Sequence, residues 1–167
     1  MLIQSLGSIS GAHFNPVVSL LEFLWGRLKA PEFFGYLISQ FTGAIAGVWI
    51  THIMFSQEVL QVSLKARFGV GLWISEVVAT FGLICTIALA GRKHVEFAPF
   101  SVAAYITAAY WFTSSTSFAN PAVTLARVLT NTFCGISPPG VVPYMCAQLF
   151  GALIAFVILK NIPQRTS

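Results

Sequence analysis

Four apolar runs, each long enough to cross a lipid bilayer, constrain the fold of this chain more than any other feature. Three of the runs contain no Asp, Glu, Lys or Arg, and the fourth contains only Glu76. Because about 20 residues of helix cross a hydrocarbon core of about 30 Å, each run predicts a membrane span. Charged residues make up only 8% of the chain, so we predict an all-α membrane protein. The predicted spans are residues 33–55, 68–91, 98–116 and 141–159.

Positive charges in the connections predict an orientation. Lys65 and Arg67 lie in the connection 56–67, whereas six other Lys and Arg residues lie in connections that alternating spans place on the opposite side. Since Lys and Arg are enriched in cytoplasmic loops, we expect 56–67 to be an extracellular linker and 161–167 a cytoplasmic tail. The six are Arg27, Lys29, Arg92, Lys93, Lys160 and Arg165.

Two Asn-Pro motifs, each followed by a short apolar run, occur far apart in the chain. The first lies in GAHFNPVVSLL, residues 11–21, and the second in SFANPAVTLAR, residues 117–127. Asn is a good helix N-cap and Pro fits the first helical position, so each motif predicts the start of a helix. The two helices, within 15–25 and 120–129, would extend about 15 Å, half the hydrocarbon thickness. We therefore predict two re-entrant half-helices.

The span after each motif repeats one pattern. YLISQFTGA (36–44) and YMCAQLFGA (144–152) share Tyr, Gln, Gly and Ala in register, which indicates an internal repeat. Each copy holds an odd number of spans, so the second is predicted to lie inverted, with the functional site where the copies meet. Residues 68–160 hold a whole repeat, but 1–55 hold only the end of one span, the half-helix and the span 33–55. We expect a fragment or a mis-set start; the alternative is a reduced protein that completes its bundle with another chain.

Half-helices that meet N-terminus to N-terminus predict a water-filled passage. Non-helical backbone at membrane depth is tolerated only where it is buried in protein or lines such a cavity. Each N-terminus carries about half a positive charge, so the junction repels cations, protons included. The amide N–H groups of Asn15 and Asn120 can still donate to the oxygen of a neutral hydroxylated molecule. These features predict a passive channel for small uncharged solutes.

The motifs SGAHFNPVVS and NPAV, the segment SEVVATFGL and the repeated Tyr, Gln and Gly-Ala pattern resemble the major intrinsic protein family, the aquaporins and glycerol facilitators. The resemblance covers essentially the whole chain. It implies a right-handed helical bundle of inverted repeats, here lacking the first span and most of the second. It also implies a homotetramer with one pore in each subunit and no cofactor. We expect this tetramer to lie in a bacterial inner (plasma) membrane. The implied pore motifs are Asn15, Pro16, Val17, Asn120, Pro121 and Ala122, with Val17 where the family usually has Ala.

The outer constriction departs from the family pattern. Most members have an Arg three positions after the second Asn, but this chain has Val123, and Val18 occupies the corresponding place in the first copy. The resemblance also places Ala108 and Ser117 at this filter. Small side chains imply a wide aperture that passes water and glycerol-like polyols or neutral metalloid hydroxides such as arsenite. Some bacterial members associated with arsenic resistance look similar at the position of Val123.

Arg127 lies one helical turn after Val123 and has two interpretations. Helical side chains lean towards the N-terminus, so its guanidinium could reach back to the constriction. Alternatively, Arg127 extends to the outer membrane interface.

Two further residues receive roles from the resemblance. Glu76 is implied to accept hydrogen bonds from the backbone of the re-entrant loop, and His13 to line the cytoplasmic vestibule. Whether His13 acts as a pH gate or only bonds neighbouring backbone is open. His52 and His94 offer no ligand spacing, so no metal site is predicted.

Other functional classes were weighed against a channel. An enzyme is not expected, because no nucleophile and base occur at suitable spacing and Asp is absent. Inverted repeats with broken helices also occur in secondary transporters, which is the main alternative. A third interpretation is a non-conducting fragment whose lumen opens to lipid. The expected partners are water, small neutral solutes and the bilayer, and nucleic acid is not expected.

Overall fold

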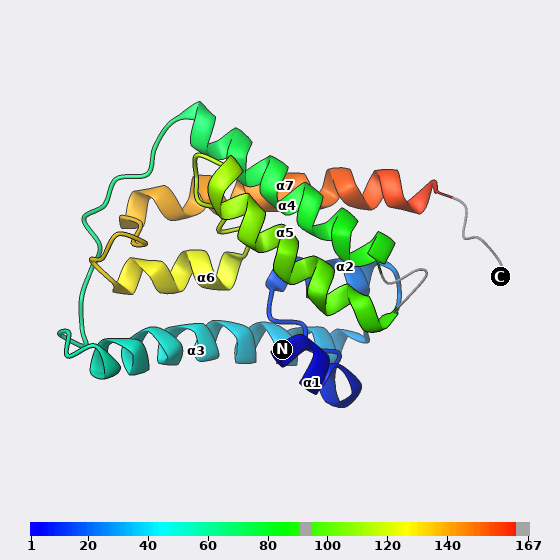
Figure 1. The fold of residues 1–167 in the computed structure, drawn as a ribbon, viewed down its shortest axis with the longest axis horizontal. Coiled ribbons are helices and arrows are strands. Elements are labelled where there is room, and N and C mark those ends of the chain that lie inside the picture. The colour runs from blue at the N-terminus through cyan, green and yellow to red at the C-terminus, as the bar shows by residue number, and fades with distance from the viewer. Residues whose placement is uncertain (91–94, 163–167) are drawn as a thin grey trace.

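All regular structure in the described residues, 1–90 and 95–162 of this computed structural model, is helical (Figure 1). The charged residues Arg92, Lys93 and Arg165, used above for orientation, lie outside this range, as do His94 and most of the predicted tail 161–167. The elements are α1 (Leu2–Ser10), α2 (Pro16–Leu24), α3 (Ala30–Met54), α4 (Val70–Ala90), the 3-10 helix η1 (Val95–Phe97), α5 (Ala98–Phe112), α6 (Pro121–Ala126), the 3-10 helix η2 (Arg127–Leu129) and α7 (Pro138–Lys160).

Three helices in the described residues are long and apolar enough to cross a membrane. They are α3, α4 and α7, of 25, 21 and 23 residues, and they coincide with three of the four predicted apolar runs. The prediction of an all-α membrane protein is therefore confirmed.

The fourth run, 98–116, forms a shorter helix than its composition predicts. α5 has 15 residues and ends at Phe112. The hydroxyl of Thr113 donates to the carbonyl of Ala109 at 2.6 Å, and the backbone then enters the left-handed region at Thr116, Ser117 and Ala119, with φ values of 63°, 46° and 46°. A right-handed helix cannot continue through such values, so the chain turns inward towards the second Asn-Pro motif.

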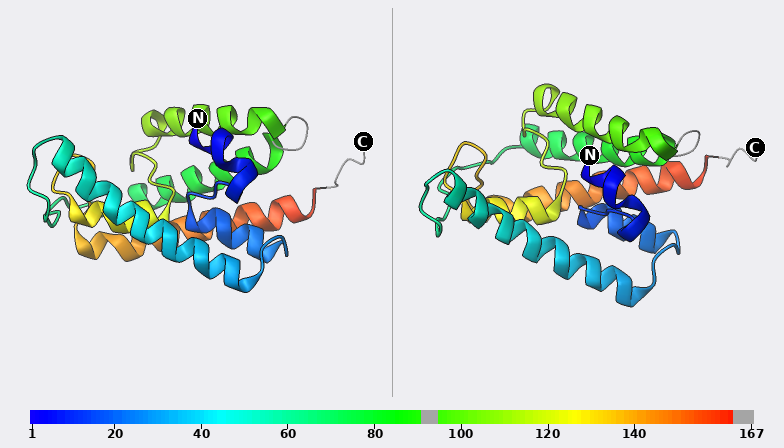
Figure 2. Two further views of the ribbon diagram at one scale, coloured as in Figure 1. Left: turned by 90° about the horizontal axis from the view of Figure 1, so that it is seen from below. Right: turned by 60° about the horizontal axis from the view of Figure 1, so that its bottom comes forward.

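Residues 1–6, the predicted end of a span, lie at the start of α1, which continues to Ser10. This helix stops at Gly11, whose φ of 68° places it in the left-handed region and lets its N–H bond the carbonyl of Gly7. No residue of α1 is buried, although Ile3 packs on the cluster formed by α4 and α5. Figure 2 shows α1 beside α5.

The two short helices pack on the opposite repeat. From α2, Val17 and Leu21 pack against Ile84 of α4 and Ala152 of α7. The second short helix, α6, lies between α3 of the first repeat and α7 (Figure 1). Each half of the chain therefore contributes to the core of the other.

Small residues bring α4 and α7 close together. A Cβ added at Gly151 would lie 2.4 Å from the carbonyl oxygen of Val77, far inside van der Waals contact. Only glycine fits at this crossing, which is the pattern that allows close approach of membrane helices.

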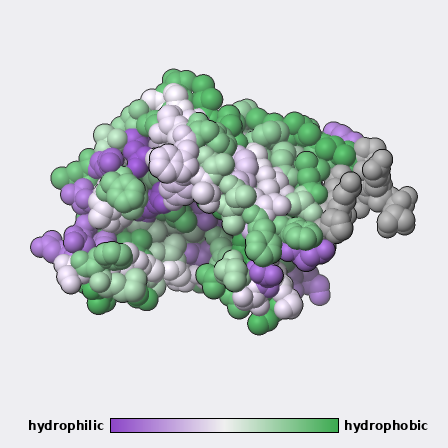
Figure 3. Space-filling model, viewed as in Figure 1, coloured by the Kyte–Doolittle hydropathy of each residue, from purple (hydrophilic) through white to green (hydrophobic). Residues whose placement is uncertain are grey.

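Apolar side chains cover most of the surface in view (Figure 3). Ile38 of α3 is 67% exposed and Trp111 of α5 is 87% exposed, as expected of helices that face lipid.

Candidate functional site

The two Asn-Pro motifs start their helices in the same way. The side-chain oxygen of Asn15 accepts from the N–H of Val17 at 3.1 Å, and that of Asn120 accepts from the N–H groups of Ala122 and Val123 at 3.0 and 3.2 Å. Both Asn residues have extended backbones, and a Pro follows each at the first helical position. These are N-caps that satisfy donors which a helix start leaves free.

The two caps are also bonded to each other's loops. The Asn15 amide donates to the carbonyl of Ala119 at 2.7 Å, and the Asn120 amide donates to the carbonyl of Phe14 at 2.8 Å. Each Asn therefore bonds the residue that precedes the other Asn, and the two helix N-termini meet. A side-chain amide has two N–H bonds, and the described residues engage one on each Asn.

A buried carboxylate holds the loop before the second Asn. Glu76 on α4 is fully buried and accepts from the N–H groups of Phe118 and Ala119, both at 2.8 Å. The Gln148 amide on α7 supplies a third donor at 2.6 Å. Three charge-assisted hydrogen bonds compensate for the burial of this carboxylate and fix the backbone at the motif.

Glutamine and hydroxyl residues form matching contacts in both repeats, which the sequence analysis did not foresee. Gln148 also donates to the hydroxyl of Thr124 at 2.8 Å, and Gln40 donates to the hydroxyl of Ser19 at 2.9 Å and to the carbonyl of His13. Ser19 and Thr124 each lie four residues after an Asn. A hydroxyl at the same offset in both copies, opposite the repeated Gln, was the available signal.

Three predicted filter residues, Ala108, Ser117 and Val123, and the predicted pore-lining residue Val18 differ in their surroundings. Val18 and Val123 are half-buried and Ala108 is exposed. Ser117 is only 5% exposed, and its hydroxyl has no hydrogen-bond partner in the described part of the chain. Only Val123 of these four lines the cavity described next.

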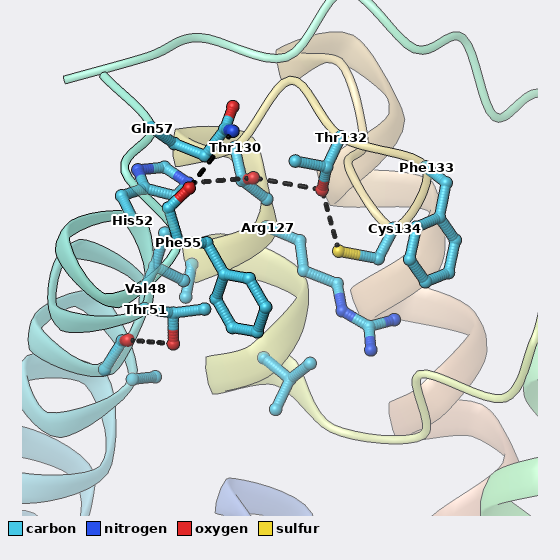
Figure 4. A pocket seen from close by; sticks show the side chains of 14 residues that line it. Val48, Thr51, His52, Phe55, Gln57, Arg127, Thr130, Thr132, Phe133 and Cys134 are labelled. Atoms are coloured by element: carbon cyan, nitrogen blue, oxygen red, sulfur yellow. Dashed lines mark hydrogen bonds between the residues drawn. The ribbon is translucent and has the colours of Figure 1, made fainter. Parts of the chain in front are cut away.

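A cavity of about 540 Å³ opens between α3 and the segment from α6 to Cys134. Its hollow is visible in Figure 3, and Figure 4 shows the side chains around it. His52 closes one end, where its Nδ1 lies 3.0 Å from the carbonyl of Val59 and its Nε2 lies 2.9 Å from the hydroxyl of Thr130. Since a carbonyl only accepts, Nδ1 carries a proton and donates to Val59, and Nε2 and the Thr130 hydroxyl share the other hydrogen bond.

Arg127 extends along this cavity (Figure 4). Its Nη2 donates to the Tyr110 hydroxyl at 2.9 Å, and its Cζ lies 4.0 Å from the centroid of the Phe118 ring. Its other terminal nitrogen, Nη1, is buried without a partner in the described residues.

Arg67 has a structural role that its position in a loop did not reveal. It is 8% exposed and donates to the carbonyls of Gly135, Ser115 and Phe133 at 2.8, 3.2 and 3.0 Å. Its Cζ also lies 4.9 Å from the ring centroid of Phe118. The linker is thereby tied to both loops that flank the second half-helix.

His13 lies half-buried in the loop before the first motif. Its ring stacks on Tyr36 with centroids 4.9 Å apart. Burial lowers the pKa of His13 below its usual value of 6.5, and the carboxylate of Glu22 acts in the opposite direction. The neutral imidazole is therefore favoured over a wider pH range. In residues 1–90 and 95–162, no group of three or more His, Cys, Asp or Glu side chains is arranged to hold a metal ion.

The chain matches the family described as Major intrinsic protein over residues 1–119 and again over 93–167. It belongs to the major intrinsic protein family. The Aquaglyceroporin AqpS of Rhizobium meliloti (strain 1021) is 51% identical over 160 residues, which cover 96% of this chain and 69% of that relative. Aquaporin NIP3-1 of Arabidopsis thaliana is 29% identical over 143 residues, or 77% of this chain and 44% of the relative. Aquaporin-8 of Mus musculus is 29% identical over 113 residues, or 61% of this chain and 43% of the relative.

Membership of the major intrinsic protein family accounts for the helical architecture. The fold is of the aquaporin type, built of apolar helices long enough to cross the membrane and of short helices capped by Asn. The chain spans a little over two thirds of the rhizobial relative's length and less than half of the other two.

Proposed function

We propose that this major intrinsic protein forms a passive transmembrane channel for water and small uncharged solutes. The observation that carries the proposal is the reciprocal bonding of Asn15 and Asn120, which brings two helix N-termini together. Each Asn retains a second amide N–H that can donate to an oxygen of the permeant.

The same junction would reject ions. Two opposed N-termini together present roughly one positive charge, so a cation is repelled. No carboxylate of the described residues is available there to replace the water molecules of its hydration shell. Glu76, the carboxylate nearest to the second motif in the network above, is occupied by three donors. Protons fall under the same exclusion as other cations.

The permeants we propose are water, glycerol-like polyols and neutral metalloid hydroxides such as arsenite. Val123, Ala108 and Ser117 would form a wide outer filter, since none carries a bulky or charged side chain. The 51% identical rhizobial relative is called an aquaglyceroporin, which supports passage of solutes larger than water.

We further propose a homotetramer in a bacterial inner membrane with a cytoplasmic C-terminus. The rhizobial relative supports the bacterial setting, and the distribution of Lys and Arg supports the orientation. Crosslinking in native membranes followed by mass analysis would detect a species of four chains.

Stopped-flow light scattering on proteoliposomes tests the permeants. Vesicles that hold the full chain should shrink and reswell faster than empty vesicles in gradients of glycerol and of arsenite, with flux that does not saturate. Water flux with exclusion of both solutes would refute the wide filter. Saturable flux that requires an ion gradient would indicate a transporter, and flux equal to that of empty vesicles would refute conduction.

A further inference from the structure

The outer constriction lacks an Arg at position 123, yet a guanidinium lies close by. Arg127 lines the same cavity as Val123 and lies one turn after it on the same helical face. Its Nη2 and its guanidinium plane are both held, by Tyr110 of α5 and by the ring of Phe118. Both contacts lie on the side of the second motif, and Phe118 is two residues from Asn120.

One nitrogen of this guanidinium lacks a hydrogen-bond partner. Arg127 Nη1 is buried and bonds no atom of the described residues. Buried polar groups are normally satisfied by protein or by ordered water, so this N–H group is expected to bond a water molecule or another small molecule with an oxygen atom in the cavity that Arg127 lines. A guanidinium N–H can only donate, so the partner must accept.

No carboxylate forms an ion pair with Arg127 in the described residues, and the buried Glu76 carboxylate is occupied by the N–H of Phe118 and two other donors. In residues 1–90 and 95–162 the single ion pair within 4 Å joins Arg27 to Glu22, far along the sequence from this cavity. Arg67, the other guanidinium near Phe118, adds to the positive charge. The field at the mouth of the passage therefore opposes cations before they reach the half-helix junction.

We propose that Arg127 is a specificity-determining residue of the outer constriction and that Tyr110 and Phe118 are its positioning residues. This inference rests on the proposed channel function and deepens it. Cations would be rejected both at the half-helix junction and at Arg127, which lies one helical turn after position 123, where most family members have an Arg. Neutral solutes with hydrogen-bond-accepting oxygens are retained, because Nη1 can donate to them.

Two measurements on the full chain in proteoliposomes test this assignment. The first is site-resolved modification of arginines by p-hydroxyphenylglyoxal, read by mass spectrometry, with Arg27 as the internal reference. Tyr110→Phe removes one hydroxyl and keeps the ring, so Arg127 should react about fivefold faster in this variant, the factor that one hydrogen bond is typically worth. Arg27 should react at the same rate in both proteins.

The second measurement is proton leak, followed with a trapped pH dye under an imposed pH gradient. Arg127→Ala should raise the leak about tenfold, because it removes a poorly screened charge at the constriction. Arg127→Lys should restore part of the barrier, and Tyr110→Phe should show a smaller increase than Arg127→Ala. The matched control Arg27→Ala removes a cytoplasmic-side arginine and should leave the leak unchanged.

Each result decides the assignment. Equal reactivity of Arg127 with and without the Tyr110 hydroxyl would overturn the positioning role and favour an arginine at the membrane interface. An unchanged leak in Arg127→Ala, with normal water flux, would overturn the specificity role. If wild-type vesicles pass neither water nor glycerol, the proposed function fails, and the modification rates alone decide whether Arg127 is held as described.

Discussion

Asn15 and Asn120 each donate a hydrogen bond to the carbonyl that precedes the other, at 2.7 and 2.8 Å. The arrangement makes each Asn both a cap for its own helix and a link to the opposite repeat. Removal of either side chain therefore affects both halves of the chain.

Asn15→Ala and Asn120→Ala should each destabilise the protein. Loss of the N-cap costs about 1 kcal/mol, and the carbonyl left without its donor adds about 1 kcal/mol or more. We expect a lower thermal midpoint in detergent and reduced water flux in vesicles. Asn161→Ala is the matched control, because the Asn161 side-chain amide donates to the carbonyl of Val157 within its own helix end. A midpoint for Asn15→Ala equal to that of the control would contradict the cross-link.

Glu76→Gln should loosen the loop before the second motif. The substitution keeps the shape of the side chain but removes the charge and turns an NH₂ group towards one of the N–H donors of Phe118 and Ala119. A cost of about 2–4 kcal/mol is expected for a charged partner removed from a buried network. Hydrogen exchange at the amides of Phe118 and Ala119 should accelerate. The exposed residue Glu58 provides the control substitution Glu58→Gln, and equal protection in the two variants would argue against the loop-holding role.

Gly151→Ala should separate α4 from α7. The added Cβ would lie 2.4 Å from the Val77 carbonyl oxygen, and overpacking of this kind costs about 1–3 kcal/mol. Gly43→Ala, at a site with no atom within 4 Å of the added Cβ, should leave the thermal midpoint unchanged or raise it slightly. If both variants unfold at the same temperature, the two helices are not as close as described.

Stability should fall in mild acid because of His13. Burial lowers the pKa of folded His13 below the unfolded value of about 6.5, so the unfolded chain binds more protons between these two values. The contribution of neutral His13 is complete above about pH 6.5 and declines as the pH drops towards the folded pKa. Thermal midpoints measured between about pH 5 and about pH 7.5 should show this decline, and His13→Gln should flatten it. An unchanged slope in His13→Gln would assign the acid sensitivity to another group.

The features predicted from sequence are those governed by solvent and by local capping. Bilayer-length apolar runs predicted α3, α4 and α7, and the Asn-Pro motifs predicted the starts of α2 and α6. Each of these patterns can be recognised in a stretch of consecutive residues. The end of α5 at Phe112 was missed, since the residues after it are compatible with a helix and leave it only through contacts with the buried loop.

Long-range partners of polar residues were the harder part of the site. Arg67 was counted as a loop charge, although its three acceptors lie 48 to 68 residues away in sequence. The repeated Gln was recognised, but its bonds to Ser19 and Thr124 depend on how two helices face each other. Such contacts follow from the packed arrangement and are not encoded in any short segment.

The cross-links between the repeats also set an order on biosynthesis. Asn15 leaves the ribosome 104 residues before Ala119, the carbonyl that its amide will bond. During translation the Asn15 amide therefore lacks this partner until the segment that contains Ala119 has been synthesised. The two loops that carry Asn15 and Asn120 would then close together in one late step.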